Sequence, residues 1–168
     1  YSAALKNLVD QNIRAEGDQL EVYFIHENTS KARALTVRSR TAREDTRSLS
    51  PTDLEAAENA YHLSIQRERQ MITTALIDKL MEDNRSASNA ETHVSAAAQV
   101  IASALQNNPR VDAWFFSDMV ESRKAGRDFH SNPPKSQKQA TAWAMEDASA
   151  YKPLDLAGTD IHLILPFS

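Results

Sequence analysis

The residues best suited to chemistry surround one stretch, VDAWFFSDMVES, residues 111–122. Its apolar run ends abruptly in Ser117 and Asp118, and Glu121 follows close behind. A carboxylate at the tip of a buried strand suits Mg²⁺, which prefers oxygen ligands. The alternative is structural, because an aspartate after a strand can accept hydrogen bonds from the backbone of its own turn. Both interpretations of Asp118 remain open from the sequence.

A second polar group, His26 and Glu27, ends the apolar stretch LEVYFIHE, residues 20–27. The carboxyl ends of parallel strands meet at one edge of a sheet, where ligands bind. We therefore expect these two residues to lie near Asp118. A cluster of His, Glu and Asp could bind a metal or act as a general base, whereas the alternative is an ordinary polar strand end. Ser117 could hydrogen-bond a ligand there, but FFSDM lacks the Gly-flanked turn that a nucleophilic serine usually needs.

The composition is that of one soluble globular domain and excludes several functions. The chain has 168 residues, of which 25% are charged and 41% apolar, and its net charge is −4. This charge argues against a nucleic-acid binder that works through a basic field. The lack of cysteine excludes disulfides, thiol nucleophiles and thiolate metal sites. No apolar run approaches the roughly 18 residues needed to span a bilayer, so we expect no membrane span.

Helices and strands are expected to alternate along the chain. Apolar strands are predicted at 20–27, 111–117 and 160–167, with a short edge strand at 34–40. Amphipathic helices are predicted at 1–15 and 93–106, and another carries Ala140, Trp143 and Tyr151. Apolar strands separated by such helices are typical of βαβ crossovers. The prediction is therefore a single three-layer α/β domain over residues 1–168, with a mostly parallel sheet and helices on both of its faces.

A long helix is predicted at about 51–83. Ser50, Pro51 and Asp53 resemble a capping box, and apolar residues then recur at helical spacing without Gly or Pro. Such a helix would be about 50 Å long at 1.5 Å per residue, longer than a small domain is wide. We therefore expect residues 50–83 to form a long helix, or a helical hairpin, inserted into the domain.

Three stretches of the chain resemble the von Willebrand factor A-like family. ETHVSAAAQVIASALQNNPRVDAWFFSDMVES, residues 91–122, is similar to the family's threonine, Ala-rich helix and hydrophobic strand ending in Ser-Asp-Gly. LKNLVDQNIRAEGDQLEVYFIHE, residues 5–27, looks like the first helix and second strand, and LAGTDIHLILP looks like the last strand. The resemblance implies a three-layer α/β fold with a metal-ion-dependent adhesion site.

The resemblance implies only part of that metal site. The family's Asp-x-Ser-x-Ser turn and the strand before it do not occur, so we expect the chain to begin after that strand or the fold to differ. Met119 stands where the family usually has Gly. The implied ion is Mg²⁺, with Mn²⁺ or Ca²⁺ as alternatives. Its ligands would be Asp118 and Thr92, and the edge of the site would comprise Ser117, His26, Glu27 and Glu121.

The leading hypothesis is a non-enzymatic protein-interaction module, acting in adhesion or as a scaffold, in which a partner's carboxylate completes the coordination of the ion. The expected partner is a protein and not a nucleic acid. The alternative is a hydrolase of the doubly wound class that uses Asp118, His26 and His130 as acid–base groups or metal ligands, which requires one pocket holding all three. A third possibility is a scaffold in which the helix at 51–83 makes the contacts.

Overall fold

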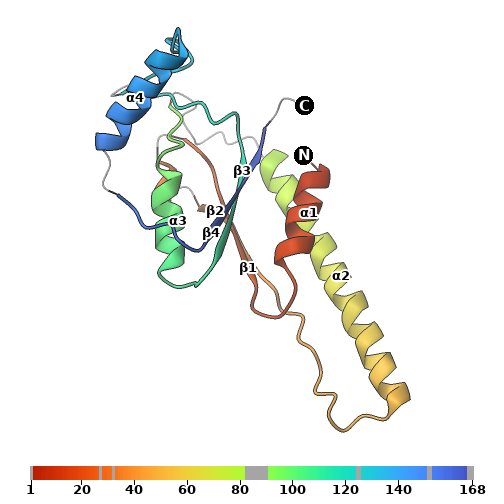
Figure 1. Ribbon diagram of the computed structural model, residues 1–168. Helices are drawn as coiled ribbons and strands as arrows, with labels where there is room; N and C mark the ends of the chain where they lie inside the picture. The colour runs from red at the N-terminus through yellow and green to blue at the C-terminus, as the bar shows by residue number, and fades with distance from the viewer. Residues whose placement is uncertain are drawn as a thin grey trace. The chain divides into compact units, whose positions relative to one another are not determined.

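The computed structural model describes residues 2–26, 28–31, 33–81, 91–123, 126–150 and 153–165. These residues form four α-helices, four strands and a short 3₁₀ turn, Thr29–Lys31 (Figure 1). The chain divides into two compact units. Unit 1 comprises Tyr1–Val22 and Arg33–Asn84, and unit 2 comprises Tyr23–Ala32 and Arg85–Ser168.

Unit 1 is built on two helices, α1 (Ser2–Asn12) and α2 (Pro51–Met81). α1 runs antiparallel to α2 along its C-terminal half (Figure 1). The buried apolar residues recur at helical spacing and come from both segments: Leu5, Leu8, Val9, Ile13, Ile65, Ile72 and Leu76. The hydroxyl of Tyr61 and the Nε of Arg69 donate hydrogen bonds to the last carbonyls of the α1 segment. The burial of these two apolar stripes therefore stabilises unit 1.

The predicted N-cap of α2, Ser50, is confirmed. The backbone N–H of Asp53 donates to Ser50 Oγ at 3.3 Å, and the Ser50 hydroxyl donates to the Asp53 carboxylate at 2.7 Å. Pro51 is the first helical residue, where its missing N–H costs no hydrogen bond. The sequence therefore marks the start of this helix correctly.

α2 continues as a single helix through its polar middle, QRERQ, residues 66–70. Two charged side chains of this stretch are used inside unit 1. Arg69 holds the end of α1, and the Glu68 carboxylate accepts hydrogen bonds from Ser39 Oγ and the Arg40 N–H, both at 2.8 Å. The helix does not break there, because these residues have partners on neighbouring segments. That α2 is an insertion within one domain stays a prediction.

The first sheet pairs β1 (Gln19–Tyr23) with β2 (Arg33–Arg38) in antiparallel orientation. Gly17, with φ of +91°, makes the turn into β1, and its N–H donates to the Ser39 carbonyl at 3.0 Å. The predicted α1 helix is shorter than expected, because the Asp18 carboxylate binds the N–H groups of the two residues after Ile13 instead.

Unit 2 contains the second sheet, in which β3 (Val111–Phe116) pairs in parallel with β4 (Thr159–Ile164). α3 (Ala97–Leu105) packs against β3, and α4 (Gln137–Ala150) lies in the connection between the two strands. Gly158, with φ of +89°, makes the turn into β4, and its carbonyl accepts the N–H of Val111 at 3.0 Å. The strands pair in register from Val111 with Thr159 to Phe116 with Ile164.

The predicted three-layer fold is wrong. The described strands form two separate two-stranded sheets, one antiparallel and one parallel, in place of a mostly parallel sheet with helices on both faces. A short connection joins β1 to β2, so these strands pair as antiparallel neighbours without the crossover that we expected. Apolar runs identify strands, but the partner of each strand depends on long-range contacts that periodicity does not contain.

The helix that carries Trp143 was expected to cover a face of the sheet, but its described contacts are elsewhere. Trp143 packs on the loop after β3, with the Arg127 guanidinium 4.6 Å from the centre of one of its rings and the Phe129 ring centre 6.0 Å away. None of the α4 residues is buried. Tyr151 lies outside the described residues. Arg127 also pairs with Glu146 and Asp147 of α4, so polar contacts attach this helix to the loop.

Candidate functional site

Most of the residues predicted to form a site lie in the loop after β3 and the segment paired with it. Asp118 is exposed, and its Oδ1 accepts the N–H of Val120 at 3.0 Å. Ser117 Oγ accepts the N–H of Met119, which has a φ of +60°. Both side chains therefore stabilise the tight turn, which is the structural interpretation of Asp118. Its role as a metal ligand stays a prediction.

Thr92 joins this loop through its backbone. Its N–H and carbonyl exchange hydrogen bonds of 2.8 and 3.0 Å with Ser122, in an isolated antiparallel bridge. The segment before α3 is thereby held against the end of the loop. Thr92 and the edge residue Glu121 thus lie in the same region, and their contacts are with neighbouring residues of that region.

Glu121 connects the loop to the segment before α3. Its Oε2 accepts the backbone N–H of Ser95 at 2.9 Å, and its Oε1 accepts the Ser95 hydroxyl at 2.8 Å. Arg123 Nε lies 2.8 Å from the same carboxylate. Ser95 is in the turn that leads into α3, two residues before the helix begins. Glu121 therefore joins the loop to the turn before α3.

Asp128 organises the second part of the loop. Its carboxylate accepts hydrogen bonds from the hydroxyls of Ser131 and Ser122 and from the N–H groups of His130 and Ser131. Hydrogen bonds from the Ser131 side chain and backbone, with those from Ser122 and His130, hold the pKa of Asp128 below its usual range despite some desolvation. The carboxylate stays charged, and its acceptor sites are used within the loop.

His26 is tied to the 3₁₀ turn that follows it. Its Nδ1 lies 3.0 Å from the N–H of Asn28, and its carbonyl accepts the Thr29 hydroxyl at 2.9 Å. The same hydroxyl lies 3.1 Å from the carbonyl of His93, next to Thr92, so His26 does approach the predicted region. Glu27 lies outside the described residues. The described residues contain no group of three or more His, Cys, Asp or Glu side chains that could hold a metal ion.

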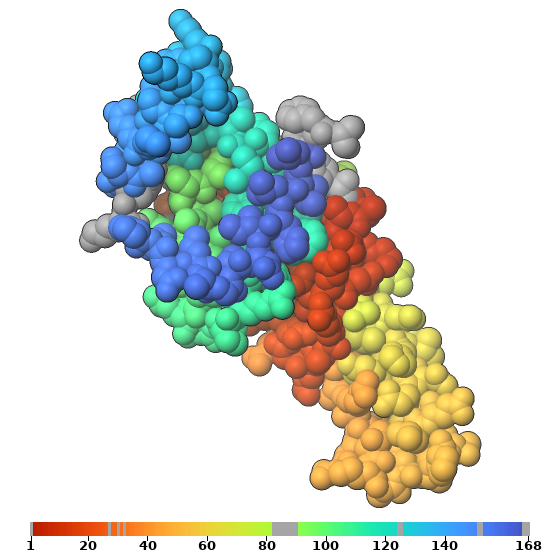
Figure 2. All heavy atoms as spheres, viewed as in Figure 1, coloured from red at the N-terminus to blue at the C-terminus, as the bar shows by residue number. Residues whose placement is uncertain are grey.

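The sequence did not identify an exposed apolar stripe on β4 and the residue that follows it. Ile161, Leu163 and Leu165 are 54%, 52% and 51% exposed, although the run DIHLILPF suggested a buried strand. Their neighbours point to the other face, where His162 stacks on Trp114 with ring centres 4.1 Å apart. Figure 2 shows the C-terminal residues, in dark blue, at the surface of the viewed face. Only His162 interrupts the apolar run IHLIL, so the sequence lacks the alternation that would have revealed a two-sided strand.

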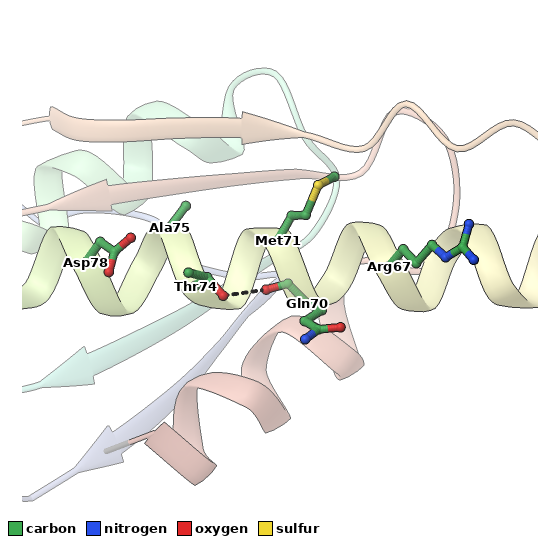
Figure 3. Close-up of a pocket in the computed structure, with 6 residues that line it drawn as sticks. All are labelled: Arg67, Gln70, Met71, Thr74, Ala75 and Asp78. Carbon is green, nitrogen blue, oxygen red and sulfur yellow. Dashed lines mark hydrogen bonds between the residues drawn. The ribbon is translucent and has the colours of Figure 1, made fainter.

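A second surface feature is an open hollow along α2. Its lining residues all come from this helix and recur at helical spacing: Arg67, Gln70, Met71, Thr74, Ala75 and Asp78 (Figure 3). Met71 is 67% exposed. Thr74 donates its hydroxyl to the Gln70 carbonyl at 3.1 Å, a contact within the helix. The hollow is therefore shallow and open to solvent, without convergent polar groups of the kind that fix a small molecule.

No protein-family model matches the chain, and no curated protein or solved structure is significantly similar to it. None of these comparisons indicates a von Willebrand factor A-like domain. Within the described part of the chain, no helix is both long and apolar enough to cross a membrane.

Proposed function

We propose that the chain is a protein-binding module in which the outer edge of β4 accepts an extended apolar segment of a partner protein. The observation that carries this proposal is the exposed row of Ile161, Leu163 and Leu165. Alternate residues of a strand lie on one face about 6.6 Å apart, so these three side chains form a straight apolar ridge.

The backbone of β4 supports the same interaction. Among the described residues β4 pairs with β3 alone, so its other edge has no strand beside it. Edge strands are normally protected from further pairing by charges, prolines or bulges. The one carboxylate of β4, Asp160, is paired with Arg110 at 2.6 Å. The edge from Ile161 onward carries apolar residues and one histidine, a composition suited to an added strand.

The spacing of the exposed apolar residues indicates what sequence the partner segment should have. An added strand makes main-chain hydrogen bonds to the edge and places every second side chain against the ridge. Covering a half-exposed Leu or Ile contributes about 1 kcal/mol, and ordering the segment opposes this gain. The ridge alone is too small for tight binding, so the backbone pairing must contribute. We expect a short segment with apolar residues at alternate positions and an affinity that is micromolar or weaker.

A peptide-binding experiment tests this function. The probe is a fluorescein-labelled peptide that alternates valine and threonine, and the comparison peptide has the same composition arranged in two blocks. We expect the alternating peptide to bind more tightly in fluorescence anisotropy. Leu163→Lys should weaken its binding by about tenfold or more, which is 1.4 kcal/mol, because the lysine ammonium would lose its hydration against an apolar partner.

Leu154→Lys is the matched control, because Leu154 is also an exposed leucine but lies outside β4. It should leave binding unchanged. A peptide N-methylated at alternate positions should bind less well if main-chain hydrogen bonds are made. Equal binding of the alternating and block peptides, or equal loss in Leu163→Lys and Leu154→Lys, would contradict the proposal.

The other predicted functions gain no specific support from the described contacts. The divalent-ion site of Asp118 and Thr92 stays a prediction and is not needed for strand addition. The hydrolase hypothesis also stays a prediction, since the contacts of His26, Asp118 and His130 are with their own loops. We further expect no nucleic-acid binding by this edge, because a lone, paired Arg110 supplies little positive charge.

A further inference from the structure

The hollow on α2 belongs to a helix face that unit 1 does not use. The buried side of α2 carries Ile65, Ile72 and Leu76. At about 100° per residue, Met71 and Asp78 lie more than a quarter turn away from these three. Both are exposed, so this face points away from α1.

The face has opposite charges at its two ends. Arg67 lies toward the helix N-terminus and Asp78 toward the C-terminus, about 16 Å apart along the axis at 1.5 Å per residue. Figure 3 shows them at opposite ends of the row, with Met71, Thr74 and Ala75 between them. Neither charge forms an ion pair with any residue that the structure describes. The row therefore has a basic residue at one end, an acidic residue at the other, and uncharged residues between them.

We propose that this face binds the same face of a second copy of the chain, with the two α2 helices antiparallel. A two-fold axis that crosses the exposed face at the level of residues 72 and 73 would place Arg67 of each copy opposite Asp78 of the other. The same axis would place Met71 of each copy on Thr74 of the other. Such an isologous contact forms two symmetry-related ion pairs between Arg67 and Asp78, and it covers the exposed Met71 side chain.

Charge complementarity sets the orientation of this contact. A parallel pairing in register would place Arg67 beside Arg67 and Asp78 beside Asp78, which is repulsive. Exposed ion pairs add little affinity, but they discriminate strongly between arrangements. The small residues Ala60 and Ser64 extend the row toward the helix N-terminus and permit close approach of the two helices.

The expected dimer is weak. A stable interface buries about 800 Å² per partner, and one exposed helix face of this length covers less than that. The contact should therefore form at high protein concentration and weaken with added salt. It does not rest on the proposed function of β4, which uses residues of unit 2.

Sedimentation velocity over a concentration series, with charge-reversed variants, tests this inference. Arg67→Glu and Asp78→Arg should each weaken the dimer by about tenfold or more, because each creates two like-charge contacts. The double variant restores opposite charges and should dimerise like the parent chain. An equimolar mixture of the two single variants should form heterodimers, in which both contacts pair opposite charges.

Circular dichroism of each variant checks that the helix content is unchanged. A chain that stays monomeric at the highest concentration, or a dimer that persists in both single variants, would overturn the inference. Loss of the dimer in Leu163→Lys, with no loss in Arg67→Glu, would assign self-association to β4 and would also overturn it. Absence of the α2 dimer would not contradict peptide binding by β4, which the anisotropy experiment tests separately.

Discussion

Two carboxylates of the β3 loop show how surroundings decide the role of a residue. Asp118 and Glu121 lie three residues apart, and both follow β3. Asp118 is exposed and accepts the N–H of Val120 in its own turn, whereas Glu121 joins the loop to the start of α3 through Ser95. The sequence favoured Asp118 because of the family resemblance. Spacing along the chain does not show which carboxylate lies next to a helix terminus.

Glu121→Ala should destabilise unit 2. The change removes the acceptor for the Ser95 N–H and hydroxyl and leaves Arg123 without this carboxylate. Loss of hydrogen bonds to a charged acceptor costs about 1.5 kcal/mol or more, so the free energy of unfolding in urea should fall by about that amount. Glu16→Ala removes an exposed glutamate elsewhere and serves as the control, with an expected change below about 0.5 kcal/mol. Equal stability of the two variants would show that the contacts of Glu121 do not stabilise unit 2.

At the scale of elements, the glycine turns and polar side chains decide where helices and strands begin. Gly17 and Gly158 both have positive φ and both precede a strand. Their surroundings differ. A Cβ on Gly17 would meet only the end of the flexible Arg38 side chain, at 3.7 Å, whereas a Cβ on Gly158 would lie 2.8 Å from the carbonyl oxygen of Pro109. The second turn therefore fits β4 against the segment before β3.

Gly158→Ala and Gly17→Ala form a matched pair of variants. Gly17→Ala should lower the free energy of unfolding by about 1 kcal/mol, because alanine is strained at positive φ and meets no clash there. Gly158→Ala adds a clash with a backbone oxygen, so its free energy of unfolding should fall by at least about 2 kcal/mol. Urea denaturation of both variants measures the difference. An equal decrease in the free energy of unfolding of both variants would mean that the backbone near Pro109 moves to accommodate the added methyl group.

At the scale of the whole molecule, each of the two units contains a carboxylate that organises a loop. Glu68 in unit 1 binds the segment after β2, and Asp128 in unit 2 binds the loop after β3. Desolvation raises the pKa of Glu68, but hydrogen bonds from Thr41, Arg40 and Ser39 outweigh it and leave the pKa below its ordinary 4.5. The pKa of Asp128 likewise lies below its ordinary 3.8. Both groups therefore favour folding when charged.

The lowered pKa values predict a loss of stability in acid. Each contribution is complete above the ordinary pKa and is lost as pH falls through the lower folded pKa. The thermal midpoint should therefore fall as pH drops below about 4.5. Glu68→Gln and Asp128→Asn should each lower the midpoint at neutral pH and flatten this dependence. A variant that keeps the full acid dependence of the parent chain would show that its carboxylate does not contribute.

The sequence predicted several elements of the fold but not their arrangement. The capping residues and apolar period of α2 were sufficient to place its start, because helical contacts are local. The strands were found from their apolar runs, since β4 and β3 are rich in β-branched and aromatic residues. The three-layer sheet was wrong, because strand pairing joins residues far apart in the chain. The β4 ridge was missed for the same reason, as its exposure depends on what covers it.

Local chemistry was thus determined by the sequence itself: the charge of −4, the absence of thiols, the capped long helix and the loop rich in hydroxyls and carboxylates after β3. The charge and the thiol content are sums over the sequence, whereas the helix cap and the loop composition depend on residues within a few positions of one another. The tertiary structure alone decided that β1 pairs with β2 and β3 with β4, that Glu121 meets Ser95, and that one row of β4 side chains stays exposed. Such contacts join distant segments, and their free energy depends on burial that no local pattern specifies.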